Sequence, residues 1–232
     1  MGKEKTGETY QIDEVQGSQV CESAPCEYGR QQGDYTLEDY YALPEEQRVE
    51  LIDGNFFVME APDLLHQMLG GEIFQRLSDY IKSGGGMCIA AYAPLDVQLD
   101  CDNRTMVQPD VLVVCDRKKF VRRGVIFGAP DLVAEILSPS TRRKDMYLKL
   151  KKYDEAGVRE YWLVDPDRKR VVVYDLENGE CPAVYSFEDT VPVGIFGGEC
   201  TVNFSEIYEY VSFLYHNGEN DEDVVNEETA QL

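Results

Sequence analysis

Apolar side chains recur along this chain at two spacings, which predict helices and strands. Between residues 64 and 82 they fall three or four positions apart, which is the spacing of one helix face, and glycines follow directly. Residues 49–52 and 56–59 flank Asp53-Gly54-Asn55, a combination typical of a β-hairpin. A short helix over residues 36–43 is expected to precede the hairpin, because a capping pattern opens it.

The second half of the chain predicts a sheet. Two nearly continuous apolar runs, 106–115 and 132–137, suit strands in the buried middle of a sheet, and the alternating segment 87–99 suits a further strand. A helix is expected over residues 140–156, since Ser140 or Thr141 can cap it and a glycine ends it. Further strands are expected at 161–164, 171–174 and 183–187, and a helix at 205–214. This order predicts an α/β fold with a central mixed β-sheet flanked by helices.

Polar composition sets the ends of the chain apart from its middle. Residues 1–34 are polar and rich in Gln, Gly and Glu, which predicts a disordered or loosely attached arm. Residues 217–232 carry six acidic side chains and no basic one, which predicts an acidic tail. The folded domain is therefore expected over residues 35–216.

Charge changes the picture of what the chain binds. The net charge of −22 argues against nucleic acid, since a large negative field repels phosphates. Residues 117–159, however, hold twelve basic and five acidic side chains. This basic island predicts a face that binds an anion, although a solvated protein surface produces the same pattern.

Two further features bear on the compartment. No run of about 18 apolar residues exists, so no membrane span is expected, and the first residues lack the apolar core of a secretion signal. The seven cysteines are scattered, without a CxxC pair, which argues against a disulfide scaffold and against a zinc ribbon. We expect a reducing cytoplasm.

Two carboxylates stand in apolar strands. Asp110 opens one apolar run, and Glu135 lies inside another, where an uncompensated charge is costly. A divalent cation compensates such carboxylates, and Lys149 on the next helix offers a positive charge beside it. Three ordinary roles stay open: a turn for Asp110, a water-facing edge strand for Glu135, and a solvated helix face for Lys149.

The motifs together resemble those of bacterial Uma-type "putative restriction endonucleases", a branch of the PD-(D/E)XK nuclease superfamily. The resemblance covers about three quarters of the chain. Its motifs are Arg48 to Gly54, His66, Gln108-Pro109-Asp110, Asp131 to Thr141, Asp145, Lys149, Tyr153, Gly157-Val158 and Glu160 to Asp165.

The resemblance implies a restriction-endonuclease-like core and a metal-dependent endonuclease that hydrolyses phosphodiester bonds of DNA. It implies that Asp110 and Glu135 bind Mg²⁺ or Mn²⁺, helped by the carbonyl group of Ile136 and by Glu50. The superfamily motif also calls for a lysine two positions after the glutamate, where this chain has Leu137. Lys149 matches a family lysine and is expected to take that role.

Five other residues are candidate contributors to the site. His66 either lies near the metal or makes a local hydrogen bond at a helix start, and Asp145 precedes Lys149 by four positions, which suits an orienting ion pair. Three cations at a helix start oppose the helix dipole, and a bound phosphate would offset that cost. These expected nucleic-acid contacts are Arg142, Arg143 and Lys144.

A second class of function stays open beside the nuclease: a nuclease fold that no longer cuts and binds nucleic acid or protein. The position of Lys149 distinguishes the nuclease from the binding protein. An amine within about 4–6 Å of both Asp110 and Glu135 can act on the metal-bound water. RNA or branched substrates form a third, weaker alternative. A homodimer is expected by analogy with the superfamily, and the acidic tail is expected to cover the basic face.

Overall fold

The structure is a computed structural model that describes residues 31–44, 47–84, 86–99, 102–121 and 124–217. Its helices are α1 (Leu37–Tyr41), α2 (Leu64–Ser83), η1 (Arg117–Lys119), the π-helix η2 (Lys144–Lys149), α3 (Leu150–Ala156), η3 (Gly194–Phe196), α4 (Phe204–Val211) and α5 (Phe213–Asn217). The strands of the first half are β1 (Val49–Ile52), β2 (Asn55–Val58), β3 (Ile89–Tyr92), β4 (Asp96–Gln98), β5 (Met106–Val107), β6 (Val111–Val114), β7 (Phe120–Val121) and β8 (Val125–Phe127). Those of the second half are β9 (Leu132–Ile136), β10 (Glu160–Asp165), β11 (Arg170–Asp175), β12 (Ala183–Ser186), β13 (Thr190–Pro192) and β14 (Thr201–Asn203).

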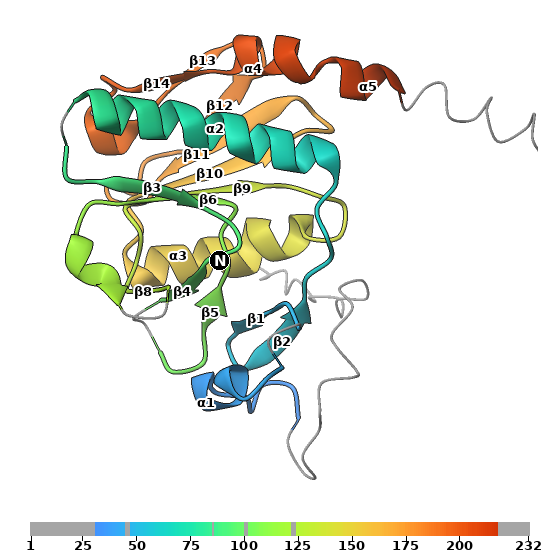
Figure 1. Cartoon of the computed structure of the whole chain (residues 1–232), viewed down its shortest axis with the longest axis vertical. Coiled ribbons are helices and arrows are strands. Elements are labelled where there is room, and N and C mark those ends of the chain that lie inside the picture. The colour runs from blue at the N-terminus through green and yellow to red at the C-terminus, as the bar shows by residue number, and fades with distance from the viewer. Residues whose placement is uncertain (1–30, 45–46, 85, 100–101, 122–123, 218–232) are drawn as a thin grey trace, which may run out of the picture.

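A mixed six-stranded sheet forms the middle layer, in the order β12-β11-β10-β9-β6-β3. Its only parallel pair is β9 with β10, and the α3 helix connects these two strands. Helix α2 covers one face of the sheet, with α4 beyond it, and α3 covers the other face (Figure 1). The expected α/β architecture, a mixed sheet between helices, is what forms.

Alternation along the strands explains why both faces of this sheet are covered. In β6, Val111 and Val113 pack into the core under α2, whereas Leu112 and Val114 pack into the core on the α3 side. Strands buried on both faces need apolar residues at every position, which is the continuous pattern that the sequence shows. Glu135 is the exception in β9, and its alternation with Val133 turns it toward α3.

A second six-stranded sheet, β2-β1-β5-β4-β8-β7, lies beside the first and carries the predicted hairpin. Two predictions are wrong here. Residues 87–99 and 106–115 were each expected to be one strand, but each divides into two short strands that belong to different sheets. Pro94 and Pro109 lie at the two divisions, and a proline has no N–H to donate to a ladder. The chain therefore passes from one sheet to the other at each proline.

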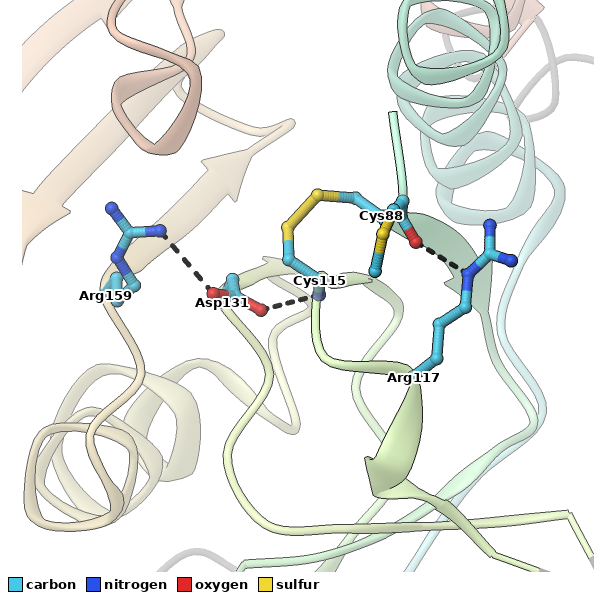
Figure 2. The surroundings of a disulfide bond; sticks show 6 residues. Cys88, Cys115, Arg117, Asp131 and Arg159 are labelled. Carbon is cyan, nitrogen blue, oxygen red and sulfur yellow. Dashed lines mark hydrogen bonds and ion pairs between the residues drawn. A yellow bond between two sulfur atoms is a disulfide. The ribbon is translucent and has the colours of Figure 1, made fainter. Parts of the chain in front are cut away.

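A disulfide bond joins Cys88 to Cys115 across β3 and β6 (Figure 2). Because Ile89 faces Val114 in this antiparallel pair, the next position outward brings the two cysteines together. The same corner is held by Asp131, which accepts a hydrogen bond from the amide of Cys115 at 2.7 Å and lies 3.5 Å from Arg159. The cysteine pattern argued only against a disulfide scaffold and did not predict this single bond. The pairing depends on strand register, which cysteine spacing does not reveal.

The expected ends of the domain fall partly outside the described residues. Of the predicted arm, only residues 31–34 are described, and they contact the hairpin: Phe56 donates its amide hydrogen to Gln32 at 2.9 Å, and Gly33 donates to Gly54. These four residues therefore belong to the fold. The predicted acidic tail lies outside the described part, apart from its first residue at the end of α5. Within the described residues, no helix has the length and apolar character to cross a bilayer.

Candidate active site

The central sheet brings the two predicted carboxylates together. Val111 faces Ala134 in the antiparallel β6–β9 pair, so the next position places Asp110 opposite Glu135. Both side chains line a cleft of about 710 Å³ between the sheet, the hairpin and the start of α2. Asp110 and Glu135 are 25 positions apart in the sequence and thus meet only through strand pairing, at the ends of two strands.

Glu135 is buried and accepts two hydrogen bonds on one oxygen. The ammonium group of Lys149 lies 2.8 Å from Oε1, and the hydroxyl of Tyr153 donates to the same atom at 2.7 Å. Burial raises the pKa of Glu135 to about 8; Lys149 opposes that shift, but the nearby charges of Asp110 and Asp145 add to it. The site therefore holds a carboxyl group that takes up and gives up a proton near neutral pH.

Glu50 is fully buried in β1 and is held by two lysines. Lys144 lies 2.5 Å from Oε2, Lys149 lies 2.7 Å from Oε1, and the amide of Gln108 donates to Oε1 at 2.9 Å. Burial alone would raise the pKa of Glu50, but the two ammonium groups outweigh it and lower the pKa to about 2. Glu50 is thus ionised, and its two ion pairs connect the β1–β2 hairpin to η2, which carries Lys144 and Lys149.

A π-helical turn explains how both lysines reach Glu50. Lys144 and Lys149 are five residues apart, and in an α-helix that separation rotates the side chains about 140° around the axis. In π geometry, the residue five positions on lies one turn above the first, so both face the same way. The expected helix forms and ends at Gly157, whose φ is +88°, but the sequence did not predict that its first part, η2, is π-helical.

Asp110 has partners on both sides of the cleft. The ring nitrogen Nε2 of His66 lies 3.2 Å from Oδ2, and the amide of Ile136 donates to the same oxygen at 2.8 Å. His66 makes both contacts that the sequence left open, because its own amide also donates to the helix-capping Asp63 at 2.7 Å. Burial lowers the pKa of His66, but Asp110 outweighs burial, so the pKa lies above its usual value.

Asp145 is buried behind the two glutamates. The expected i,i+4 pair is present, with Oδ1 3.6 Å from the ammonium group of Lys149. That oxygen is out of contact with water and has no hydrogen-bond donor among the described residues. Burial raises the pKa of Asp145, and Lys149 and Lys144 oppose this. An oxygen in this condition is one that a nearby cation would stabilise.

The predicted nucleic-acid contacts need correction. Lys144 is not a free cation at a helix start but is buried against Glu50. Arg142 is not free either: its guanidinium group forms a two-pronged contact with Asp165, at 2.6 and 2.9 Å, and a third contact with Asp167. Arg143 alone of the three is exposed, and no described residue pairs with it. Two of the three predicted contacts thus neutralise buried carboxylates, which net charge alone does not reveal.

The distance criterion for Lys149 is met for one of its two carboxylates, Glu135, at 2.8 Å. Its ammonium group contacts Glu135 and Glu50, and the sequence had paired Glu135 with Asp110. Leu137, at the motif's lysine position, is buried in the core on the α3 side. Because positions 135 and 137 alternate onto the same face of β9, the helix lysine reaches the face that a lysine at 137 would have reached.

Sequence reasoning missed two residues that hold the carboxylates. From the sequence, Tyr153 was only a motif residue without a role, but it donates to Glu135, and its position four residues after Lys149 on the same helix face is the signal that indicates this. Gln108 donates its amide hydrogen to Glu50 across the β1–β5 junction, which only the sheet pairing reveals.

The described residues contain no group of three His, Cys, Asp or Glu side chains arranged to hold a metal ion. The donor chemistry nevertheless suits a hard divalent cation, because oxygen ligands are what Mg²⁺ prefers. Among the described residues, four carboxylates gather around two ammonium groups, and one carboxylate oxygen has no hydrogen-bond donor. An added cation would therefore balance the cluster. The four carboxylates are Glu50, Asp110, Glu135 and Asp145.

Comparison with known proteins points to one family. Residues 37–202 match the profile of a family described as "Uma2: Putative restriction endonuclease". A solved structure described as a "putative nuclease belonging to DUF820 from Anabaena variabilis ATCC 29413" superposes with a TM-score of 0.65 at 22% identity, covering 76% of this chain and 98% of that one. A search of curated proteins found no match. The structural likeness confirms the predicted restriction-endonuclease-like fold.

Proposed function

Because the chain belongs to the Uma2 family of "putative restriction endonucleases", we propose that it is a metal-dependent endonuclease that hydrolyses phosphodiester bonds of DNA. One observation carries the proposal. Asp110 and Glu135 lie opposite each other at the ends of two strands, in an open cleft, with the ammonium group of Lys149 2.8 Å from Glu135. Two carboxylates and one ammonium group are the set that metal-assisted hydrolysis of a phosphodiester uses.

The metal of this proposal is Mg²⁺, or Mn²⁺ in its place. Asp110 and Glu135 would hold it from their side chains and Ile136 from its carbonyl group, with Glu50 completing the site or serving a second ion. The excess of carboxylates over ammonium groups in the cluster supports this assignment. A bound divalent cation would stabilise negative charge on a phosphate and make water more acidic.

The residues of the cleft would then share the work. In hydrolysis, a water oxygen bonds to phosphorus while the bond to the leaving sugar oxygen breaks, and negative charge grows on the phosphate oxygens. Lys149 supplies fixed positive charge beside them. Tyr153 and Lys149 both bind Oε1 of Glu135 and so fix the direction of that carboxylate. Asp145 and Glu50 orient Lys149 in turn.

The remaining proposed contact to the substrate is inferred from charge and exposure. Arg143 is the exposed member of the predicted trio and is assigned to the DNA backbone. We place the protein in the cytoplasm because its proposed DNA substrate is there. The Cys88–Cys115 disulfide, however, argues against a strongly reducing compartment. Two copies acting together would cut both strands of a duplex, which is the reason to expect a homodimer.

One observation favours a second candidate, a nuclease fold that binds nucleic acid or protein without cutting. The ammonium group of Lys149 occupies an oxygen of Glu135 and one of Glu50, so a cation must share those carboxylates with it. If a metal ion cannot displace the ammonium group of Lys149 from these carboxylates, the cleft stays neutralised and inactive.

Cleavage of supercoiled plasmid and of single-stranded DNA in Mg²⁺ or Mn²⁺ tests the proposal. Asp110→Ala and Glu135→Ala should each lower cleavage by about a hundredfold or more, because each removes a metal ligand. Asp154→Ala, which removes an exposed carboxylate on α3, is the control and should cut like the wild type. A chelator should stop all cleavage.

A folded wild type that cuts neither substrate with either metal would contradict the nuclease proposal and favour the binding module. Cleavage that survives both substitutions would instead move the active site elsewhere.

A further inference from the structure

Arg48 differs from the other cations of the cleft. Lys144 and Lys149 each contact carboxylates within 2.8 Å, and His66 contacts Asp110. Arg48 also lines the cleft, yet it forms no ion pair with any residue that the structure describes. It is therefore the cleft cation whose charge stays uncompensated within the described chain.

The hairpin fixes where Arg48 stands. Its carbonyl oxygen accepts a hydrogen bond from the amide of Met59 at 3.0 Å, which continues the β1–β2 ladder by one pair. Side chains two positions apart on a strand share a face and are roughly 7 Å apart along it. Arg48 and Glu50 therefore face the same way, and Arg48 lies one step farther from the buried carboxylate cluster.

The guanidinium group of Arg48 makes few of the hydrogen bonds that it could donate to the described residues. Its only hydrogen bond to the described residues is a long one, 3.3 Å from Nη2 to Oε1 of Gln108. Its Nε is shielded from water and has no acceptor in the described chain, a condition that is costly for a charged donor. The partner amide is itself fixed, because Nε2 of Gln108 donates to Asp96 at 2.9 Å and turns its oxygen toward the arginine. A neutral amide thus orients the guanidinium group and leaves its charge intact.

We propose that Arg48 binds a phosphate group of the nucleic-acid backbone in the cleft, next to the carboxylate cluster. This inference rests on the proposed function. A cleft lined with six carboxylates, Glu60 and Asp63 among them, repels a polyanion, so the substrate needs a compensating cation at its edge. A guanidinium group presents paired donors that match two oxygens of a phosphate. The free donors of Arg48 are what such a ligand would use.

Binding of a fluorescently labelled DNA duplex to the full chain, followed by anisotropy over a series of salt concentrations, tests the assignment. Arg48→Met should weaken binding about tenfold or more, and the slope of log affinity against log salt should become shallower by about one, because one phosphate contact is lost. Arg48→Lys should recover the slope but stay several-fold weaker, since a lysine lacks the fork. Lys151→Met is the matched control: it removes one charge from a side chain that is 69% exposed and outside the cleft.

The assignment is overturned if Arg48→Met binds DNA like Lys151→Met, with the same affinity and slope, while the wild type cuts DNA. In that case the nuclease proposal survives and Arg48 serves only to hold Gln108 in place. Conversely, if Arg48→Met loses affinity and slope but the wild type cuts nothing, the phosphate contact stands and the nuclease proposal fails. A wild type that binds no DNA at any salt concentration overturns both.

Discussion

Glu50 and Glu135 are both buried in one cleft, but their pKa values move in opposite directions. Glu50 contacts two ammonium groups, which lower its pKa to about 2. Glu135 shares one of these, Lys149, and burial together with neighbouring carboxylates raises its pKa to about 8. The number of cationic partners decides the sign in each case. The cleft therefore combines a permanently charged carboxylate with one that titrates near neutrality, which is a pattern of catalytic sites.

Tyr153→Phe tests whether Tyr153 positions and ionises Glu135. A carboxyl group with a raised pKa is protonated below that pKa, and a protonated carboxyl binds a cation poorly. Metal-dependent cleavage should therefore rise with pH until Glu135 is ionised and then level off. The Tyr153 hydroxyl donates to the ionised form, so its loss should move the half-maximal pH upward by about half to one unit, the equivalent of one hydrogen bond.

Tyr161→Phe is the control for this pH profile, because it also removes a buried hydroxyl, but one that donates to the carbonyl oxygen of Asp145. It should lower stability without moving the pH midpoint. Equal midpoints for wild type and Tyr153→Phe would show that Tyr153 only packs.

At the scale of elements, the π-turn η2 is what assembles the cleft. It places three buried charged side chains, Lys144, Asp145 and Lys149, on the inner side of a helix that would otherwise turn one of them to solvent. A local departure from α-helical hydrogen bonding is unfavourable by itself, and the ion pairs with Glu50 and Glu135 compensate it. The helix is thus shaped by the carboxylates that it covers.

Lys144→Met should lower the free energy of unfolding by about 3 kcal/mol, because it leaves the buried Glu50 with one ammonium group instead of two. Arg143→Met changes the same charge one residue earlier, at an exposed position, and should change stability by less than about 0.5 kcal/mol. Urea unfolding of both variants measures the difference. Pairing Lys144→Met with Glu50→Gln should recover part of the loss, and equal stability of the two single variants would refute the buried role of Lys144.

At the scale of the whole molecule, charge is distributed unevenly between surface and cleft. The chain carries a net charge of −22, and six of the ten basic residues that the structure describes in the basic island form ion pairs with carboxylates, among them Arg142 with Asp165, Lys152 with Asp53 and Asp102, and Arg159 with Glu177. The large net negative charge repels DNA over a distance. Association with a polyanion should therefore depend strongly on what the acidic segments do.

Deleting residues 217–232 removes six acidic side chains and should tighten DNA binding at low salt. The reason is electrostatic: fewer negative charges repel the phosphates, and the effect should fade as salt screens it. Titration of labelled DNA with both forms, at low and high salt, measures this. An affinity that does not change at low salt would mean that the tail neither covers nor repels the binding face.

The sequence by itself determined the buried central strands and singled out the carboxylates of the proposed site. Strands such as 132–137 can be predicted because burial on both faces requires an unbroken apolar run. Asp110 and Glu135 are conspicuous because a charge in such a run needs a partner. The hairpin and the helix ends followed from turn and capping residues, whose preferences are local. Patterns of this kind can be recognised in the sequence because each depends on residues that are neighbours in the chain.

Only the tertiary structure decided how the charges are paired. Glu50 and Lys144 are 94 positions apart and Cys88 and Cys115 are 27 apart, so no local spacing predicts that they meet. The same holds for the π-turn, which forms because two lysines share one buried carboxylate, and for the partition of 87–99 between two sheets. Pairing of buried charges depends on which surfaces pack against each other, and that is fixed by the fold as a whole.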